Sequence, residues 1–361
     1  MTIGVDAGAL SITDDRLKVG IYRVTQNLLI HLTKRDAENN YRLYTFGEIE
    51  QGIRDSLGKN TQVVTLPKLF WQRVWLPAEL VRRPVDVFLG LSQSLPSTRS
   101  HNIGFIYDLG FLFHPWAYGS SAGKLVRQTE AVIARSDHIV TISHATKRDI
   151  LARYGISPTQ ISVCYPGVDA RFCPGADSYR TPRPYLLFVG SLNKAKDIPF
   201  TLRAFALFLR RTGLAYDFYL IGGDYWPDPE IRKIVEELGL QDRVKFFGFV
   251  SDRVLPQYYR GARAFVTSAL REGFCLPAAE SMACGTPVVS LDRGAMAEVV
   301  GEGGVVVRDS TVESFADAMS SLVHRDSDGK RLGQKSIARA KDFSWPGFAQ
   351  SVRTLIHAYE R

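Results

Sequence analysis

The chain has 361 residues, of which 45% are hydrophobic and 23% charged, and it carries a formal net charge of +8. A domain has roughly 150 residues, so this length predicts two domains, and the composition is typical of a soluble globular protein. The basic excess favours anionic partners such as nucleoside diphosphates or phospholipid headgroups. We expect no nucleic-acid partner, because the basic residues are dispersed and no nucleic-acid-binding motif is present.

Three features favour a cytoplasmic location. No apolar run approaches the ~20 residues that a membrane-spanning helix needs. The segment Met1–Asp6 has neither a basic region nor a cleavable apolar stretch, and it resembles a first strand. The cysteines fit neither a zinc site nor a disulfide framework, so we interpret them as reduced thiols that pack in the core. They are Cys164, Cys173, Cys275 and Cys284.

The first half of the chain alternates short β-branched or aromatic runs with helical stretches such as Tyr22–Leu32 and Ala145–Tyr154. Several of these runs are apolar almost throughout, which is typical of strands buried on both faces of a parallel sheet. The predicted strands are Thr2–Ala7, Tyr41–Phe46, Thr61–Leu66, Val85–Gly90, Asn102–Tyr107, His138–Ser143 and Ile161–Pro166.

Residues Pro166–Pro184 contain four prolines and two glycines, which predicts a linker. The alternation then restarts, with a helix expected over Thr201–Arg211. Two doubly wound α/β domains are therefore predicted, with ligands bound in a cleft between the carboxyl ends of their strands. The strands predicted after the linker are Tyr185–Gly190, Asp217–Gly222, Arg243–Gly248, Ala262–Thr267, Thr286–Leu291 and Gly303–Arg308.

Two stretches could carry chemistry. In the stretch 271–289, Glu272 follows a strand, Pro277 suits the first position of a helix, and Glu280 should lie in that helix's first turn. A helix N-terminus attracts anions, and two carboxylates beside it could each hold a hydroxyl pair. The alternative is that Glu280 only complements the helix dipole and Glu272 is solvated. In the stretch Phe188–Asp197, a glycine after a strand lets backbone approach phosphate, and Lys196 could neutralise its charge.

The string from Glu272 to Val289 resembles the signature of the large family of retaining GT-B glycosyltransferases, known as glycosyl transferases group one or glycosyltransferase family four. The family pattern is Glu-Gly-Phe-Gly-Leu-Pro followed by Glu-Ala-Met-Ala-x-Gly-x-Pro-Val-Val, and the two glutamates keep the family's spacing here. The stretch Phe188–Asp197 is similar to the family's Val-Gly-Arg/Ser/Thr-Leu-x-x-x-Lys-Asn. The chain resembles the polysaccharide mannosyltransferases of this family.

The resemblance implies a GT-B fold, in which two Rossmann-like domains face each other across a cleft. It implies an N-terminal acceptor-side domain at 1–170 that includes a C-terminal crossing helix at 346–361. The nucleotide-sugar-binding domain would span 183–345.

The resemblance also assigns roles to residues. Glu272 would contact the transferred sugar, Glu280 the ribose, and Lys196 the diphosphate. The remaining donor-binding positions are Gly20 over the diphosphate, Val250 near the base, and Gly190, Ser191, Gly273, Phe274, Cys275 and Leu276 in the two glycine-containing loops.

Several positions carry residues other than those most common in the family, among them Ser281 in place of an alanine. Tyr107-Asp108 replaces the His-Asp pair that faces the donor sugar, so the resemblance implies catalytic roles for Tyr107 and Asp108 beside Glu272 and Lys196, although a tyrosine would not act as a base near neutral pH. Ser191 stands where many members carry an arginine, Asp197 replaces an asparagine, and Cys275 replaces a glycine, where it could crowd the sugar.

Two further stretches could bind a metal or a membrane. Asp326-Ser-Asp328 is an Asp-x-Asp triplet that could hold a metal, but its polar context predicts a turn. The stretch Leu69–Trp75 mixes aromatic and basic residues. It could lie on a membrane surface and meet a lipid-linked acceptor, or pack as an ordinary amphipathic element of the first domain.

We therefore expect a retaining hexosyltransferase that moves mannose or a related hexose or deoxyhexose from a nucleoside-diphosphate donor to an acceptor hydroxyl. GDP-linked donors are favoured over UDP-linked ones, the acceptor is a glycan or lipid-linked glycan, and bacterial surface-polysaccharide assembly is the expected setting. We expect no cofactor, no essential metal, and a cytoplasmic protein that could contact the inner membrane peripherally. The alternatives are a non-catalytic sugar-nucleotide-binding subunit and a sugar-nucleotide 2-epimerase.

Overall fold

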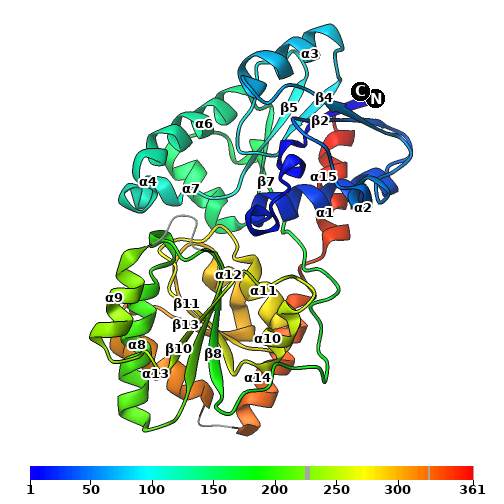
Figure 1. Ribbon diagram of the computed structural model, residues 1–361. Helices are drawn as coiled ribbons and strands as arrows, with labels where there is room; N and C mark the ends of the chain where they lie inside the picture. Colours follow the sequence, from blue (N-terminus) through cyan, green and yellow to red (C-terminus); the bar gives the residue numbers. More distant parts are fainter. Residues whose placement is uncertain (224–227, 324–325, 361) are drawn as a thin grey trace. The chain divides into compact units, whose positions relative to one another are not determined.

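A computed structural model describes residues 1–223, 228–323 and 326–360. The chain divides into two compact units. Unit 1 comprises Met1–Leu112, Ser120–Gly167 and Ser344–Arg361, and unit 2 comprises Phe113–Gly119 and Val168–Phe343 (Figure 1). The predicted end of the first domain, residue 170, lies three residues beyond Gly167, where the chain leaves unit 1, and the predicted start of the second domain, residue 183, lies sixteen residues beyond it.

Unit 1 contains a parallel sheet of seven strands in the order β3-β2-β1-β4-β5-β6-β7. Chain order reverses between β1 and β4, which are neighbours in the sheet and pair in parallel. The seven predicted strands are confirmed as β1 (Thr2–Asp6), β2 (Asn40–Thr45), β3 (Thr61–Thr65), β4 (Val87–Gly90), β5 (His101–Ile106), β6 (His138–Thr141) and β7 (Ile161–Val163).

Helices in unit 1 begin and end where local chemistry favours it. Helix α7 (His144–Tyr154) is capped by Ser143, whose hydroxyl accepts a hydrogen bond from Thr146 N, and it ends at Gly155 with φ 62°. The others described here are α1 (Gly20–Arg35), α2 (Gln51–Arg54), α3 (Leu76–Arg82), α4 (Gly110–Phe113), α6 (Ala122–Arg135) and the C-terminal α15 (Trp345–His357), which packs against α1. Trp71–Trp75 form a short π-helix before α3.

Unit 2 contains a six-stranded parallel sheet in the order β10-β9-β8-β11-β12-β13, so that chain order reverses between β8 and β11. The six strands predicted after the linker are confirmed. They are β8 (Tyr185–Val189), β9 (Asp217–Ile221), β10 (Val244–Gly248), β11 (Ala264–Thr267), β12 (Val288–Leu291) and β13 (Gly304–Val307).

Helices cover both faces of this second sheet (Figure 1). One face carries α8 (Ile198–Thr212), α9 (Pro229–Glu237) and α13 (Val312–Val323), and the other carries α10 (Leu255–Gly261), α11 (Leu276–Ala283) and α14 (Asp326–Ala340). The unit also holds α5 (Pro115–Tyr118) and α12 (Met296–Val300). The core beneath α8 and α13 is aromatic and aliphatic, with Phe205, Phe208 and Phe315 fully buried. Burial on both faces explains why these strands lack the polar alternation of half-exposed strands.

Two sequence-based expectations are wrong. The Asp326–Asp328 triplet begins helix α14 and does not form a turn. Cys173 is exposed, whereas Cys164 and Cys284 are buried as expected of core thiols. No helix among the described residues is long and apolar enough to cross a membrane.

Candidate active site

The clearest site in unit 2 lies at the reversal of strand order between β8 and β11. Lys196 follows β8 and Glu272 follows β11, and the Lys196 ammonium lies 2.6 Å from Glu272 Oε1. Open α/β sheets bind ligands at such a reversal, outside the carboxyl ends of their strands. The structure therefore brings together the two residues that the sequence singled out for the diphosphate and the sugar.

Hydrogen bonds to the backbone connect the loop after β8, which carries Lys196, with the loop after β11, which carries Glu272. Leu270 N donates to Ala195 O at 2.9 Å, and the Ser268 hydroxyl donates to Asp197 O at 2.7 Å. Lys196 closes a single 3-10 turn, after which Asp197 adopts φ 49° and starts helix α8. The cation and the carboxylate are thus positioned by the backbone of adjacent strands, as preorganised charge requires.

A third loop, which follows β12, contacts the backbone of Glu272. Glu272 forms a parallel bridge with Gly294, and Ala295 N donates to Glu272 O at 2.9 Å. Gly294 has φ 65°, and a Cβ there would lie 2.3 Å from Glu272 O. Only glycine allows this approach, because a Cβ would collide with the Glu272 backbone.

Sequence reasoning missed a second ion pair beside this site. Arg293 Nη1 lies 3.0 Å from Asp197 Oδ2 and 3.0 Å from Ser268 O. Burial raises the pKa of the Asp197 carboxyl, and the Arg293 guanidinium only partly offsets that rise. The aspartate in place of the family's asparagine was the available signal, since a half-buried carboxylate needs a cationic partner. Arg293 is thus a second fixed cation near Lys196, on a loop where sequence reasoning had not placed one.

Helix α11 begins one residue earlier than predicted. It starts at Leu276, so Glu280 lies in its second turn and not in its first. Glu280 is buried and accepts a hydrogen bond from the Tyr259 hydroxyl at 3.0 Å. A helix-dipole role is weakened by this position, because the dipole effect fades beyond the first turn.

The residue before α11 explains why a glycine is usual there. Cys275 caps the helix with φ 74°, a left-handed conformation that glycine adopts at little cost. Burial raises the pKa of its thiol, so the sulfur remains protonated at neutral pH. Gly273 is buried, and the buried Phe274 packs edge-on against Phe343 at 4.9 Å between ring centroids.

The other predicted donor positions lie at the carboxyl ends of neighbouring strands. Gly190 follows β8 with φ 151°, and a Cβ on Gly222, which follows β9, would lie 1.9 Å from Gly190 O. Ser191 is half-buried in the same loop, and the half-buried Val250 follows β10. These loops share one edge of the sheet with Lys196.

In unit 1, the residues of the expected His-Asp position have partners of their own. Tyr107 is buried, and its hydroxyl donates to Leu91 O at 2.7 Å. Burial raises the Tyr107 pKa further above neutrality. Asp108 Oδ1 accepts from Gly110 N at 2.8 Å, at the start of α4. The geometry gives Tyr107 a structural contact, and its catalytic role stays a prediction. Gly20 is exposed at the first position of α1, with open space where a Cβ would lie.

A further carboxylate lies at the strand reversal of unit 1. Asp6 ends β1 and is buried, and it accepts from the Ser92 hydroxyl at 2.8 Å and from Gly8 N at 3.1 Å. Burial raises its pKa, and these hydrogen bonds, with one from Gln72, only partly offset the rise. Its position between β1 and β4 matches that of Lys196 and Glu272 in unit 2. An acidic residue at the end of the first strand was the signal in the sequence.

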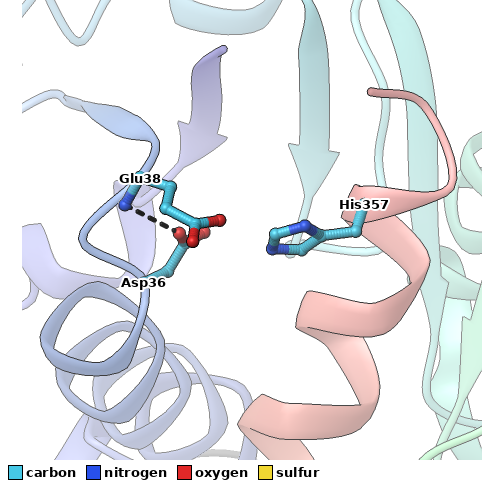
Figure 2. A group of neighbouring side chains, drawn as sticks. All are labelled: Asp36, Glu38 and His357. Carbon is cyan, nitrogen blue, oxygen red and sulfur yellow. Dashed lines mark hydrogen bonds between the residues drawn. The ribbon is translucent and has the colours of Figure 1, made fainter. Parts of the chain in front are cut away.

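One group of possible metal ligands occurs among the described residues. Figure 2 shows Asp36 and Glu38, after α1, facing His357 on α15, and their ligand atoms lie within 4.8 Å of one another. The Asp36 carboxylate already accepts from the Tyr41 hydroxyl at 2.5 Å and lies 3.9 Å from Arg353. These donors surround the carboxylate, so we interpret the group as a contact that fastens α15 to unit 1 and assign no metal to it.

Two family models match consecutive parts of the chain. One is described as Glycosyltransferase Family 4 and matches residues 64–172. The other is described as Glycosyl transferases group 1 and matches residues 183–325, the part that contains Lys196, Glu272 and Glu280.

Curated relatives match over part of their length. The O-antigen chain mannosyltransferase B of Escherichia coli is 29% identical over 60% of this chain and 56% of its own. A D-inositol 3-phosphate glycosyltransferase of Nocardia farcinica is 32% identical over 63% of this chain and 53% of its own. The chain therefore spans about half the length of these relatives.

Solved structures match over nearly the whole chain. The sucrose-phosphate synthase of Thermosynechococcus elongatus has a TM-score of 0.79 at 20% identity, covering 99% of this chain and 98% of that one. HepE of Anabaena, solved in complex with UDP and glucose, has a TM-score of 0.72 at 16% identity, covering 99% of both chains. These similarities confirm the predicted GT-B fold class of two doubly wound α/β sheets.

Proposed function

This chain belongs to the glycosyltransferases that combine a family 4 region with a group 1 region, and we propose that it transfers a hexose from a nucleoside-diphosphate sugar to an acceptor hydroxyl. The observation that carries the proposal is the ion pair between Lys196 and Glu272 across the β8/β11 reversal. A nucleotide sugar brings a diphosphate and a sugar ring to such a site. The fixed ammonium stabilises the diphosphate, and the carboxylate accepts hydrogen bonds from the hydroxyls of the sugar.

The chemistry follows from the charge that develops during transfer. The bond from the sugar to the diphosphate breaks, and negative charge grows on the departing phosphate. Lys196, Arg293 and the backbone N–H groups at the start of α11 would stabilise that charge, while Glu272 orients the sugar. We propose front-face attack by the acceptor hydroxyl, which forms the new bond to the sugar and gives its proton to the departing phosphate, with retention of configuration, because the family resemblance implies it. We propose no cofactor and no essential metal, since these cations are available for the leaving group.

The donor is proposed as mannose or a related hexose or deoxyhexose carried on GDP, with UDP as the alternative. The E. coli relative is named as a mannosyltransferase of an O-antigen chain, which favours mannose and surface-polysaccharide assembly. The HepE structure holds UDP and glucose, and for this reason UDP stays the alternative donor nucleotide. We propose a glycan or lipid-linked glycan as the acceptor and a cytoplasmic protein in peripheral contact with the inner membrane.

The test is a product analysis with wild-type protein and with Lys196→Ala and Glu272→Gln. Each nucleotide sugar is incubated with and without glycan acceptors, and the products are separated and their anomeric configuration is read by NMR. We expect acceptor-dependent transfer by the wild type and loss of transfer in both variants. Conversion of the donor without an acceptor would identify a 2-epimerase. Donor binding without any turnover would identify a non-catalytic subunit, the alternative that the Tyr107–Leu91 contact favours.

A further inference from the structure

An apolar and basic surface stands out on unit 1. Five of the eleven large apolar side chains that are exposed in the described chain fall within residues 69–81. They are Leu69 (72% exposed), Phe70 (61%), Val74 (48%), Trp75 (43%) and Val81 (74%). We call residues 68–83 the docking surface. Such clustering marks an interaction site, whereas single exposed apolar residues are ordinary.

The fold holds these side chains outward. Between them, Trp71 is buried and packs edge-on against Phe46 at 5.7 Å between centroids. The Gln72 amide donates to the Ser94 hydroxyl and, at 3.4 Å, to Asp6 Oδ2. Phe70 adopts φ 58°, which is rare for a bulky residue and is maintained only where the surroundings fix it. The inward anchors at Trp71 and Gln72 therefore determine that the neighbouring apolar residues face solvent.

The docking surface is also cationic. It contains Lys68, Arg73, Arg82 and Arg83 against the single carboxylate of Glu79, a net charge of +3. All four cations are exposed, and Glu79 is buried, where it pairs with Arg82 at 2.7 Å. Apolar and aromatic side chains flanked by exposed lysine and arginine are the composition that binds the interface of an anionic bilayer.

We propose that the docking surface binds the face of an anionic lipid bilayer. A second copy of this chain is a poorer occupant, because a two-fold interface would set the same +3 patch against itself. Gln72 links this surface to Asp6 at the strand reversal of unit 1. Under the proposed function, a lipid-linked acceptor held at the bilayer would therefore meet unit 1 beside that edge. The link to the acceptor rests on the proposed transfer reaction, whereas the lipid contact is argued from the docking surface itself.

The experiment is co-sedimentation of the full chain with vesicles of phosphatidylglycerol and phosphatidylethanolamine, and with vesicles of phosphatidylcholine alone. The test variant is Leu69→Ser with Phe70→Asn, because both side chains are exposed and asparagine tolerates the backbone of residue 70. The matched controls are Trp116→Ser, which removes an equally exposed aromatic (61%) from unit 2, and Lys124→Ser with Arg127→Ser, which removes two exposed cations from α6.

We expect the wild type and both controls to sediment with anionic vesicles and to remain in solution with phosphatidylcholine. The Leu69/Phe70 variant should bind at least about tenfold more weakly, the loss expected when two apolar side chains no longer enter the interface. Wild-type protein that ignores anionic vesicles, or a variant that binds as tightly as the wild type, would overturn the proposal. So would a wild-type dimer that the variant converts to a monomer without any vesicle binding.

Nucleotide binding by the same proteins is also measured, by thermal shift, and this measurement separates the lipid contact from the proposed transfer reaction. Vesicle binding with no response to any nucleotide sugar would leave the lipid contact standing and contradict the transferase. A nucleotide response with no vesicle binding would do the reverse.

Discussion

Replacing Gly294 by alanine should disable the proposed site without touching a charged group. The new Cβ would lie 2.3 Å from Glu272 O, whereas ordinary contact begins at 3.4 Å, so the Glu272 loop must retreat by about 1 Å. A misplacement of that size costs about 100-fold in rate for a positioned catalytic group. The left-handed φ of 65° adds a strain of about 1–2 kcal/mol, which lowers the free energy of unfolding.

Gly213→Ala is the matched control. Gly213 ends α8 with φ 67°, and no atom lies within 4 Å of its Cβ position. Both variants should lose free energy of unfolding in urea from the backbone strain, and Gly294→Ala should lose more because its Cβ also collides with Glu272 O, but only Gly294→Ala should lose turnover. The assay is release of nucleoside diphosphate from the sugar donor in the presence of acceptor. Equal turnover in the two variants would refute the claim that the third loop positions Glu272.

Three further outcomes are expected. Lys196→Ala should abolish transfer while the protein stays folded, and a transfer rate near that of the wild type would refute the assignment of the site. Lys196→Arg tests whether a positive charge at this position suffices for transfer. The pKa of Asp36 is lowered, because hydrogen bonds from its neighbours and the charge of Arg353 outweigh the effect of burial. Its stabilisation is therefore complete above the unfolded pKa of about 4 and is lost as pH falls, so Asp36→Asn should lower the free energy of unfolding at neutral pH by about 1.5–3 kcal/mol, and the free energy of unfolding of the variant, measured by urea denaturation, should fall less steeply than that of the wild type as the pH is lowered. A thiol reagent at neutral pH should label the exposed Cys173 first, because burial raises the pKa of Cys164 to about 12; labelling of Cys164 in the native protein at the rate of Cys173 would contradict this burial.

Local pattern was sufficient to predict the sheets. Each predicted strand is present because runs of apolar residues bounded by glycine and proline identify strands buried on both faces. The helix over Thr201–Arg211 was likewise visible, and it extends to Ile198–Thr212 once Asp197 and Gly213 end it in left-handed conformations.

Contacts between residues far apart in the chain could not be predicted from the sequence. Lys196 and Glu272 could be assigned by motif, but their pairing depends on β8 and β11 lying side by side, which no local spacing shows. Arg293 was missed for the same reason, since four strands, β9 to β12, separate it in the chain from its partner Asp197. Glu280 lies one residue further into α11 than predicted, because the left-handed Cys275 lets the helix start at Leu276. The orientation of Tyr107 was not predictable, because its hydroxyl depends on a backbone carbonyl of the neighbouring strand's loop.

The claim that Lys196 and Glu272 form a nucleotide-sugar site can be tested most directly by a thermal-shift panel. Wild-type protein and Lys196→Ala would be melted with GDP, UDP, ADP, CDP and dTDP, and with their common sugars. We expect one nucleotide to raise the melting temperature of the wild type, through ~2.7 kcal/mol of stabilisation at a hundredfold excess over the Kd, and Lys196→Ala to lose most of that shift. No shift with any nucleotide, or the same shift in both proteins, would contradict the account.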